Sequence, residues 1–293
     1  MSAVVLFQSV IDGLLIGGVY AIIGLGLSLA YGVMGVVNWA YGESLMVAMF
    51  ISFLLTKYAG FDPYLTAVIS IVVLGGLGYF LQGTVFNKLL NRGKDAWRDI
   101  LLFTAGLGTV LTSTFNILFG AEVKSVNTRY SGMFAVGPMM ISKPKLISFI
   151  LAAIFCIGLY FIIQKTDLGR SLRATAQDRN TSQLMGINAN QVYCICFAIS
   201  MAMVGISGAL LTPFYSVNPY VGATFSLKSF IIVAIGGKGN ISGTMVAGIL
   251  IGVIEKVVGV FLGDNIAQVF IFILFIVFLL VKPNGLLSRQ ERV

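Results

Sequence analysis

The sequence predicts an all-α protein: a polytopic membrane helix bundle with eight or nine crossings and a possible broken or re-entrant segment near residues 225–240. Composition is the first observation, because only 10% of the 293 residues are charged, whereas soluble domains carry about 25%. The second is a mean hydropathy of +0.96. The third is a succession of apolar runs close to the roughly 20 residues that a helix needs to cross the hydrocarbon core. A soluble core could bury one such run but not so many in succession.

Eight runs are long enough to cross, and together they make residues 1–293 a single transmembrane domain. They are Val5–Tyr31, Val36–Thr56, Pro63–Phe86, Ile100–Phe119, Leu146–Ile163, Gln191–Leu211, Gly243–Leu262 and Ile266–Val281. Phe225–Ile235 is apolar but too short to cross alone. It is either a half-helix or the inner part of a tilted span.

The net charge of +8 follows the positive-inside rule, because the basic residues lie mostly between apolar runs. We therefore expect no nucleic-acid partner. The connections that share one side carry Lys88, Arg92, Lys94, Arg98, Lys165, Arg170, Arg173, Arg179, Lys282, Arg289 and Arg292, and those on the other carry Lys57, Lys124, Arg129, Lys143 and Lys145. The larger set predicts a cytoplasmic C-terminus and, with nine crossings, an outer N-terminus. If Phe225–Ile235 is re-entrant, the later spans change sides.

One cytoplasmic connection contains a short polar segment that still has the pattern of a helix. Thr175 and Asp178 fit a Thr-x-x-Asp capping pattern, and Gly186 is suited to the position after the last helical turn. The helix between them, Ala176–Met185, is too short to be stable alone in water. We therefore expect it to dock on a partner, with Leu184 and Met185 as apolar contacts and Arg170, Arg173 and Arg179 as charged ones. The alternative is a solvated loop that only anchors the topology.

The sequence has no Gly-x-x-x-x-Gly-Lys-Ser/Thr phosphate loop, so any ATP must be bound by another chain. Several glycine-rich segments, taken in order, resemble the permease subunits of branched-chain amino-acid ABC importers, a family that includes urea and amide importers. They are Gly13–Ala21, Leu25–Asn38, Arg173–Arg179, Leu184–Ile187, Gly236–Ile241 and Lys282–Leu286.

The resemblance implies a permease that forms the translocation pathway for a small polar solute, most often branched-chain or other amino acids, with urea and short amides still open. It also implies that residues 164–190 form a cytoplasmic coupling loop to the ATPase. The coupling residues would be Arg170, Arg173, Thr175, Asp178, Arg179, Leu184, Met185 and Gly186. The implied partners are ATP-binding-cassette ATPase subunits, a second homologous or identical permease, an extracytoplasmic solute-binding protein and the lipid bilayer. The implied location is a bacterial or archaeal cytoplasmic membrane.

Ionisable residues inside a span are costly unless they face protein or water. Glu43 is expected about two turns into the second span, after Asn38, and Glu255 lies well inside the Gly243–Leu262 span. With Tyr41, they are the candidates for the pathway or a gate; the alternative is hydrogen bonding between helices. Trp39 and Tyr41 stand where the family usually has Phe and His, so a histidine-dependent contact is not expected.

Two other classes compete with an ABC permease. A secondary transporter or channel should show an inverted repeat and paired intramembrane acids, and the halves share only a faint similarity. An intramembrane enzyme is disfavoured because the chain has no histidine, which removes Ser–His chemistry and His-ligated zinc. The sequence therefore predicts no catalytic residue, metal or cofactor. Glycines at small-x-x-x-small spacing, including Gly13, Gly17, Gly248 and Gly252, predict close helix packing.

Overall fold

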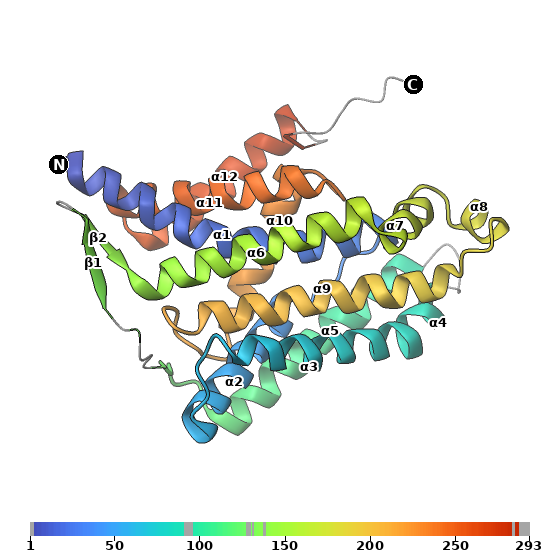
Figure 1. Cartoon of the computed structure of the whole chain (residues 1–293), viewed down its shortest axis with the longest axis horizontal. Coiled ribbons are helices and arrows are strands. Elements are labelled where there is room, and N and C mark those ends of the chain that lie inside the picture. Colours follow the sequence, from blue (N-terminus) through green and yellow to red (C-terminus); the bar gives the residue numbers. More distant parts are fainter. Residues whose placement is uncertain are drawn as a thin grey trace.

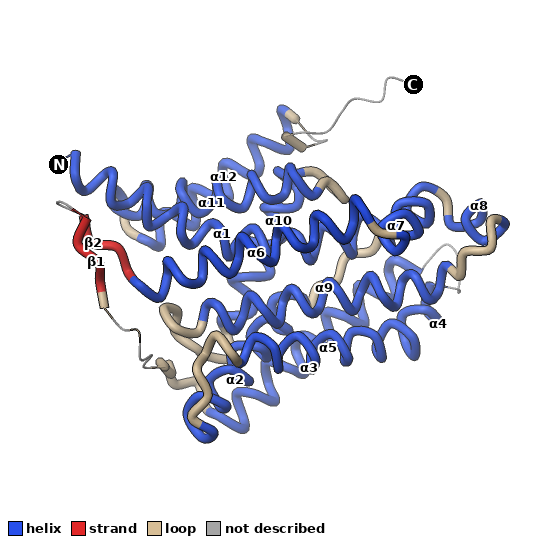
Figure 2. Tube along the Cα trace, viewed as in Figure 1, coloured by secondary structure: helices blue, strands red, loops and turns tan. Residues whose placement is uncertain are grey.

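The computed structural model describes residues 3–90, 96–126, 130, 132–136, 139–282 and 285–286. Helices lie side by side along one long direction, and the few strand residues form a hairpin at one end (Figures 1 and 2). Within this part of the chain, eight helices are long and apolar enough to cross a membrane, and a shorter apolar helix covers Val221–Gly236. The predicted polytopic helical bundle is confirmed.

The elements follow one another in the order printed in Figure 1. They are α1 (Ala3–Met34), α2 (Tyr41–Ala59), α3 (Thr66–Leu81), the π-helical turn η1 (Gln82–Phe86), α4 (Asn87–Leu90), α5 (Ala96–Phe119), β1 (Met133–Val136), β2 (Met139–Ser142), α6 (Lys143–Lys165), α7 (Asp167–Gln177), α8 (Arg179–Leu184), α9 (Ala189–Leu211), α10 (Val221–Gly236), α11 (Ile241–Leu262) and α12 (Asp264–Val281). β1 and β2 pair antiparallel. The sequence did not indicate this hairpin.

Helix directions follow from contacts along α1. Cys196 of α9 lies 3.6 Å from the carbonyl oxygen of Leu29, and α11 also runs antiparallel to α1, because Gly13 meets Val253 whereas Gly32 meets Gly239 just before α11. The start of α9 and the start of α11 therefore lie at the end of the bundle where α1 finishes, called here the Met34 end. The opposite end is the Ala3 end.

α10 is the ninth crossing. The chain leaves α9 at the Ala3 end and enters α11 at the Met34 end, so residues 212–240 must cross between them. The irregular stretch 212–220 covers the first part of this passage and α10 covers the rest. The C-terminal side also lies at the Met34 end, since the Leu286 N–H donates to the Ile235 carbonyl at 2.7 Å. Phe225–Ile235 is thus the second half of a crossing rather than a re-entrant hairpin.

Glycines let α1 and α11 pack with their backbones almost touching. A Cβ at Gly13 would lie 2.6 Å from the Val253 Cα, and one at Gly17 would lie 2.8 Å from the Ile249 Cα. The predicted small-residue packing is confirmed, and it extends to α9, where Gly205 meets Ser70 of α3. This packing places α10 and α11 in a fixed position beside α1.

Candidate transport and coupling sites

Two helices begin in the interior of the bundle and meet there. α2 starts at Tyr41 rather than at the predicted Val36, because residues 35–38 have no regular structure and 39–40 form a turn. The Gly42 N–H donates to the Ser226 hydroxyl of α10 at 2.9 Å. A Cβ at Gly222 would lie only 2.9 Å from the Glu43 Cα. The first turns of α2 and α10 are therefore in direct backbone contact, which only small residues allow.

Glu43 lies in the first turn of α2, so the predicted position two turns into a span is wrong. Its residue exposure is 8%, and the Ser226 hydroxyl lies 3.3 Å from its Oε2 atom. The N-terminal end of a helix carries a partial positive charge, which stabilises a nearby carboxylate. α5 approaches the same side chain, since a Cβ at Gly108 would lie 3.4 Å from the Glu43 carboxyl carbon. A buried acid therefore sits where α2, α5 and α10 converge.

Asn38 and Tyr41 lie beside this convergence but have structural partners. The Asn38 Oδ1 accepts from the Ala40 N–H at 3.1 Å, shaping the turn that precedes α2. The Tyr41 hydroxyl donates to the Ile23 carbonyl of α1 at 2.9 Å, and Tyr41 is 1% exposed. Tyr41 therefore ties α2 to α1, whereas Asn38 also lines a largely apolar cavity of about 300 Å³.

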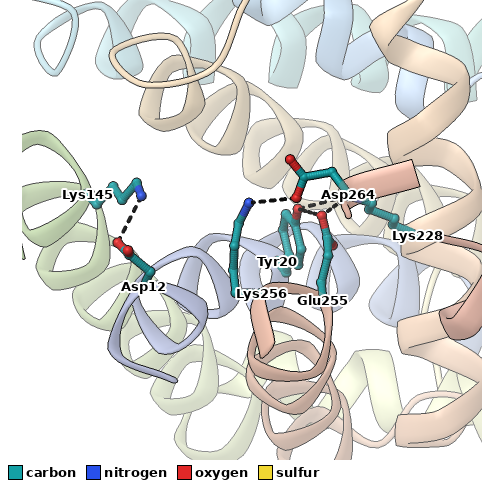
Figure 3. A network of polar contacts seen from close by, with 7 residues as sticks. All are labelled: Asp12, Tyr20, Lys145, Lys228, Glu255, Lys256 and Asp264. Carbon is teal, nitrogen blue, oxygen red and sulfur yellow. Dashed lines mark hydrogen bonds and ion pairs between the residues drawn. The ribbon is translucent and has the colours of Figure 1, made fainter. Parts of the chain in front are cut away.

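Glu255 belongs to a second buried polar cluster (Figure 3). Its Oε1 atom accepts from Lys228 Nζ of α10 at 2.8 Å and from the Tyr20 hydroxyl of α1 at 3.3 Å. Lys228 also donates to the Tyr20 hydroxyl at 2.9 Å. The side chains of Lys228 and Glu255 are only 7% and 11% exposed, so this is an intramembrane ion pair.

Sequence reasoning missed Lys228 and Tyr20 as partners of Glu255. A usable signal was present, because an ionisable residue within a span generally pairs with another, and Lys228 is the lysine of α10. The structure does confirm that Ser226 and Lys228 face different ways: Ser226 meets Glu43 of α2, and Lys228 meets Glu255 of α11. α10 therefore connects the two buried acids.

Two exposed ion pairs lie towards the Ala3 end. Asp12 pairs with Lys145 at 2.9 Å, and Lys256 lies 3.8 Å from Asp264 at the start of α12 (Figure 3). Lys256 thus points away from Glu255, as expected for a side chain that reaches towards the membrane surface. The predicted orientation also used Arg92, Lys94, Arg129, Arg289 and Arg292, which lie outside the described residues.

The polar segment between α6 and α9 forms two helices, α7 and α8, beyond the Met34 end of the bundle (Figure 1). The predicted single helix Ala176–Met185 is wrong, because the chain breaks at Asp178 with φ −152°. Thr175 is not a cap: it lies in the last turns of α7, 2% exposed, and the hydroxyl of Thr166 caps that helix instead. A side chain packed against the bundle, rather than a second cap, holds α7 in place.

Asp178 and Gly186 delimit α8. The Asp178 carboxylate accepts from the backbone N–H groups of Asn180 at 2.8 Å and Thr181 at 3.2 Å. These bonds, led by one from the Thr181 hydroxyl, hold the pKa of the Asp178 carboxyl below its usual range. Gly186 has φ +83°, and its N–H donates to the Gln183 carbonyl at 3.0 Å. The predicted glycine stop is confirmed.

Two of the three predicted arginine contacts are directed back to the chain itself. Arg173 donates to the Ile163 carbonyl of α6. Arg179 donates to Asn190 at 2.9 Å and stacks over the Tyr193 ring of α9 at 5.4 Å. Arg170 forms an exposed pair with Asp167 at 3.0 Å. Arg173 and Arg179 therefore link the loop to α6 and α9.

The apolar side chains of this loop point away from the bundle. Leu184 is 88% exposed and Met185 is 80% exposed, at the tip formed by the end of α8. A cavity of about 360 Å³ lies behind the tip, between α7 and the start of α9, with Leu172 and Ile187 among its lining residues. Two large apolar side chains at one exposed tip are typical of a docking contact.

A nine-pass helical bundle with buried charges and a protruding helix pair at one end defines a membrane permease subunit. The profile of the family described as "Branched-chain amino acid transport system / permease component" matches residues 9–279. The chain therefore belongs to this family of permease components.

Individual relatives match nearly from end to end. The high-affinity branched-chain amino acid transport system permease protein BraD of Pseudomonas aeruginosa is 31% identical, over 97% of this chain and 96% of that protein. The LivH protein of Escherichia coli, which carries the same description, is 29% identical over the same shares. The probable branched-chain amino acid transport permease LivH of Methanocaldococcus jannaschii is 25% identical, over 95% of this chain and 92% of that protein.

Proposed function

We propose that this chain forms the translocation pathway of an ABC importer for branched-chain amino acids, in a bacterial or archaeal cytoplasmic membrane. The solute follows from the relatives, whose names specify branched-chain amino acids. Specificity among small polar solutes is expected to lie largely in an extracytoplasmic binding protein, and a second permease subunit is expected to complete the pathway. The chain itself contains no phosphate loop, so ATP hydrolysis falls to partner subunits.

The observation that carries the coupling role is the exposed tip of α8. Leu184 and Met185 would sit in an apolar groove of an ATPase subunit, and burial of such side chains is the main source of contact free energy. α7 packs against α1, α6 and α9, and Arg173 and Arg179 bond to α6 and α9. A displacement of the tip would therefore reach three spans at once.

This role fixes the orientation. Because ATPase subunits bind in the cytoplasm, the Met34 end and the C-terminus face the cytoplasm, and the N-terminus and the hairpin face outward. The assignment agrees with the basic residues near the Met34 end, among them Lys165, Arg170 and Lys282. Thiol labelling tests it: a cysteine at Arg170 should react with an impermeant reagent only in inverted vesicles.

The meeting point of α2 and α10 is the best candidate for a gate. Glu43 is desolvated, held by Ser226, and placed between two helices that start inside the membrane, and broken helices of this kind border transport sites. The decisive experiment is reconstitution of this chain with its ATPase, binding protein and second permease. We expect ATP-dependent uptake of leucine, isoleucine or valine, and no ATP hydrolysis by this chain alone. Uptake of urea or amides, without amino acids, would move the assignment to that branch of the family.

A further inference from the structure

One face of α10 is uncovered. Ala223 and Leu227 are exposed, and Phe230 and Ala234 are half-buried, so their spacing of three or four residues gives a single strip along the helix. Trp39, which is 45% exposed, borders the strip by packing on Phe230 with ring centroids 5.5 Å apart. α12 borders the strip on its other side.

The space between α10 and α12, called here the α10–α12 groove, contains polar groups. It encloses about 140 Å³ and is lined by Thr224, Lys228 and Gln268 together with apolar side chains such as Leu227 and Ile271. Gln268 is exposed in the middle of an otherwise apolar helix. Hydrocarbon offers an amide no hydrogen-bond partner, so a polar side chain in a span is expected to face protein, water or a solute.

Lys228 brings a charged donor to the groove. Its ammonium has three N–H groups, and within the described part of the chain two acceptors lie close to it, the Tyr20 hydroxyl and the Glu255 Oε1. Lys228 also lines the groove, so its third N–H can meet a ligand there. The second carboxylate oxygen of Glu255 is buried without a partner among the described residues. A purely structural pair is expected to satisfy such an atom.

We propose that the α10–α12 groove binds the carboxylate group of the transported amino acid, with Lys228 and Gln268 as donors. The inference rests on the proposed function, which makes an amino acid the solute. An ammonium in a poorly solvated site attracts a carboxylate strongly. The Lys228–Glu255 pair is neutral as a whole, so a zwitterionic solute adds no net charge to the membrane interior. Leu227 and Ile271 place apolar surface beside the donors, where an aliphatic side chain fits.

Cysteine labelling in the complete reconstituted importer tests the location. The three native cysteines are buried, so the wild-type chain is the background control. Gln268→Cys should react with a hydrophilic, membrane-impermeant thiosulfonate, and leucine-loaded binding protein should slow the reaction at least about fivefold. Val269→Cys, at the neighbouring exposed position of α12, should not react. Reaction only with a lipophilic maleimide, reaction with neither reagent, or labelling that leucine does not slow would each overturn the proposal.

Substitution tests the role of the donors. Gln268→Leu should be harmless or favourable at a lipid-facing position, whereas loss of a solute contact should reduce leucine uptake at least about tenfold. Val269→Leu is the matched control. The double variant Lys228→Gln with Glu255→Gln removes both charges without leaving either one unpaired. It should still assemble and retain basal ATPase activity, with uptake reduced to a similar extent.

The outcomes separate this inference from the function on which it rests. If the wild-type complex takes up no amino acid, the proposed function fails. If it does so and Gln268→Leu and the double variant both transport normally, the α10–α12 groove is not a solute contact.

Discussion

Truncation of the α8 tip should weaken ATPase binding without affecting the fold of the permease. Leu184→Ala removes three carbons from a side chain that is 88% exposed in the free subunit, so almost all of that surface is available to a partner. At about 0.8 kcal/mol per buried carbon group, the loss in binding free energy is about 2 kcal/mol. This corresponds to a roughly 30-fold increase in Kd. Because the side chain makes little contact within the chain, its own stability should change by less than about 0.5 kcal/mol.

The assay is binding of purified ATPase to the permease held in lipid nanodiscs. Leu280→Ala on α12 is the matched control, since that leucine is 80% exposed and lies outside the loop. Its Kd should stay within about twofold of the wild type. A Kd for both Leu184→Ala and Met185→Ala within the same limit would refute the docking role, and would leave α7 and α8 as a solvated anchor.

Three further changes probe the coupling loop and the buried acid. Gly186→Val forces a β-branched residue to φ +83°, at a cost of about 1–2 kcal/mol, and should uncouple ATP hydrolysis from uptake, whereas Gly158→Ala, whose Cβ meets open space in α6, should not. The lowered pKa of Asp178 means that its cap stabilises α8 above the carboxyl's ordinary pKa of 3.8 and is lost as pH falls through the lowered pKa; ATPase binding should therefore weaken in strongly acidic buffer, and Asp178→Asn, which still caps, should abolish that pH dependence. Glu43→Gln keeps the size of the side chain and the bond to Ser226, so normal assembly with uptake reduced by about tenfold or more would indicate a pathway role, and unchanged uptake in both Glu43→Gln and Glu43→Ala would exclude one.

The fold was predictable because the membrane imposes a strong constraint. Apolar length located all eight long helices, and glycine spacing correctly indicated the close packing of α1. The start of α2 was less predictable, since residues 36–40 are as apolar as a helix but form an irregular entry instead. Hydropathy reports burial in lipid or protein and does not distinguish the two, so it could not locate a helix that begins inside the bundle.

The sites were only partly predictable, because pairing across helices depends on tertiary structure. Local signals at Asp178 and Gly186 correctly located the ends of α8, since caps act within a few residues. The same local pattern wrongly assigned a cap to Thr175, whose side chain is turned into the bundle. The partnership of Glu255 with Lys228 spans 27 residues, so the sequence could indicate that each needs a partner but not which one.

The glycine contacts between α1 and α11 also determine which parts of the molecule can move. Gly13, Gly17 and Gly24 bring α1 against α11 at successive turns, and Gly32 adds a contact with Gly239 in the turn before it. Helices matched backbone to backbone at such regular intervals cannot slide past one another or rotate without collision. α1 and α11 should therefore travel as one rigid body during a transport cycle. Alternating access must then arise by tilting of this unit against the α2, α3 and α5 side, with the meeting point at Gly42 and Gly222 as the hinge line.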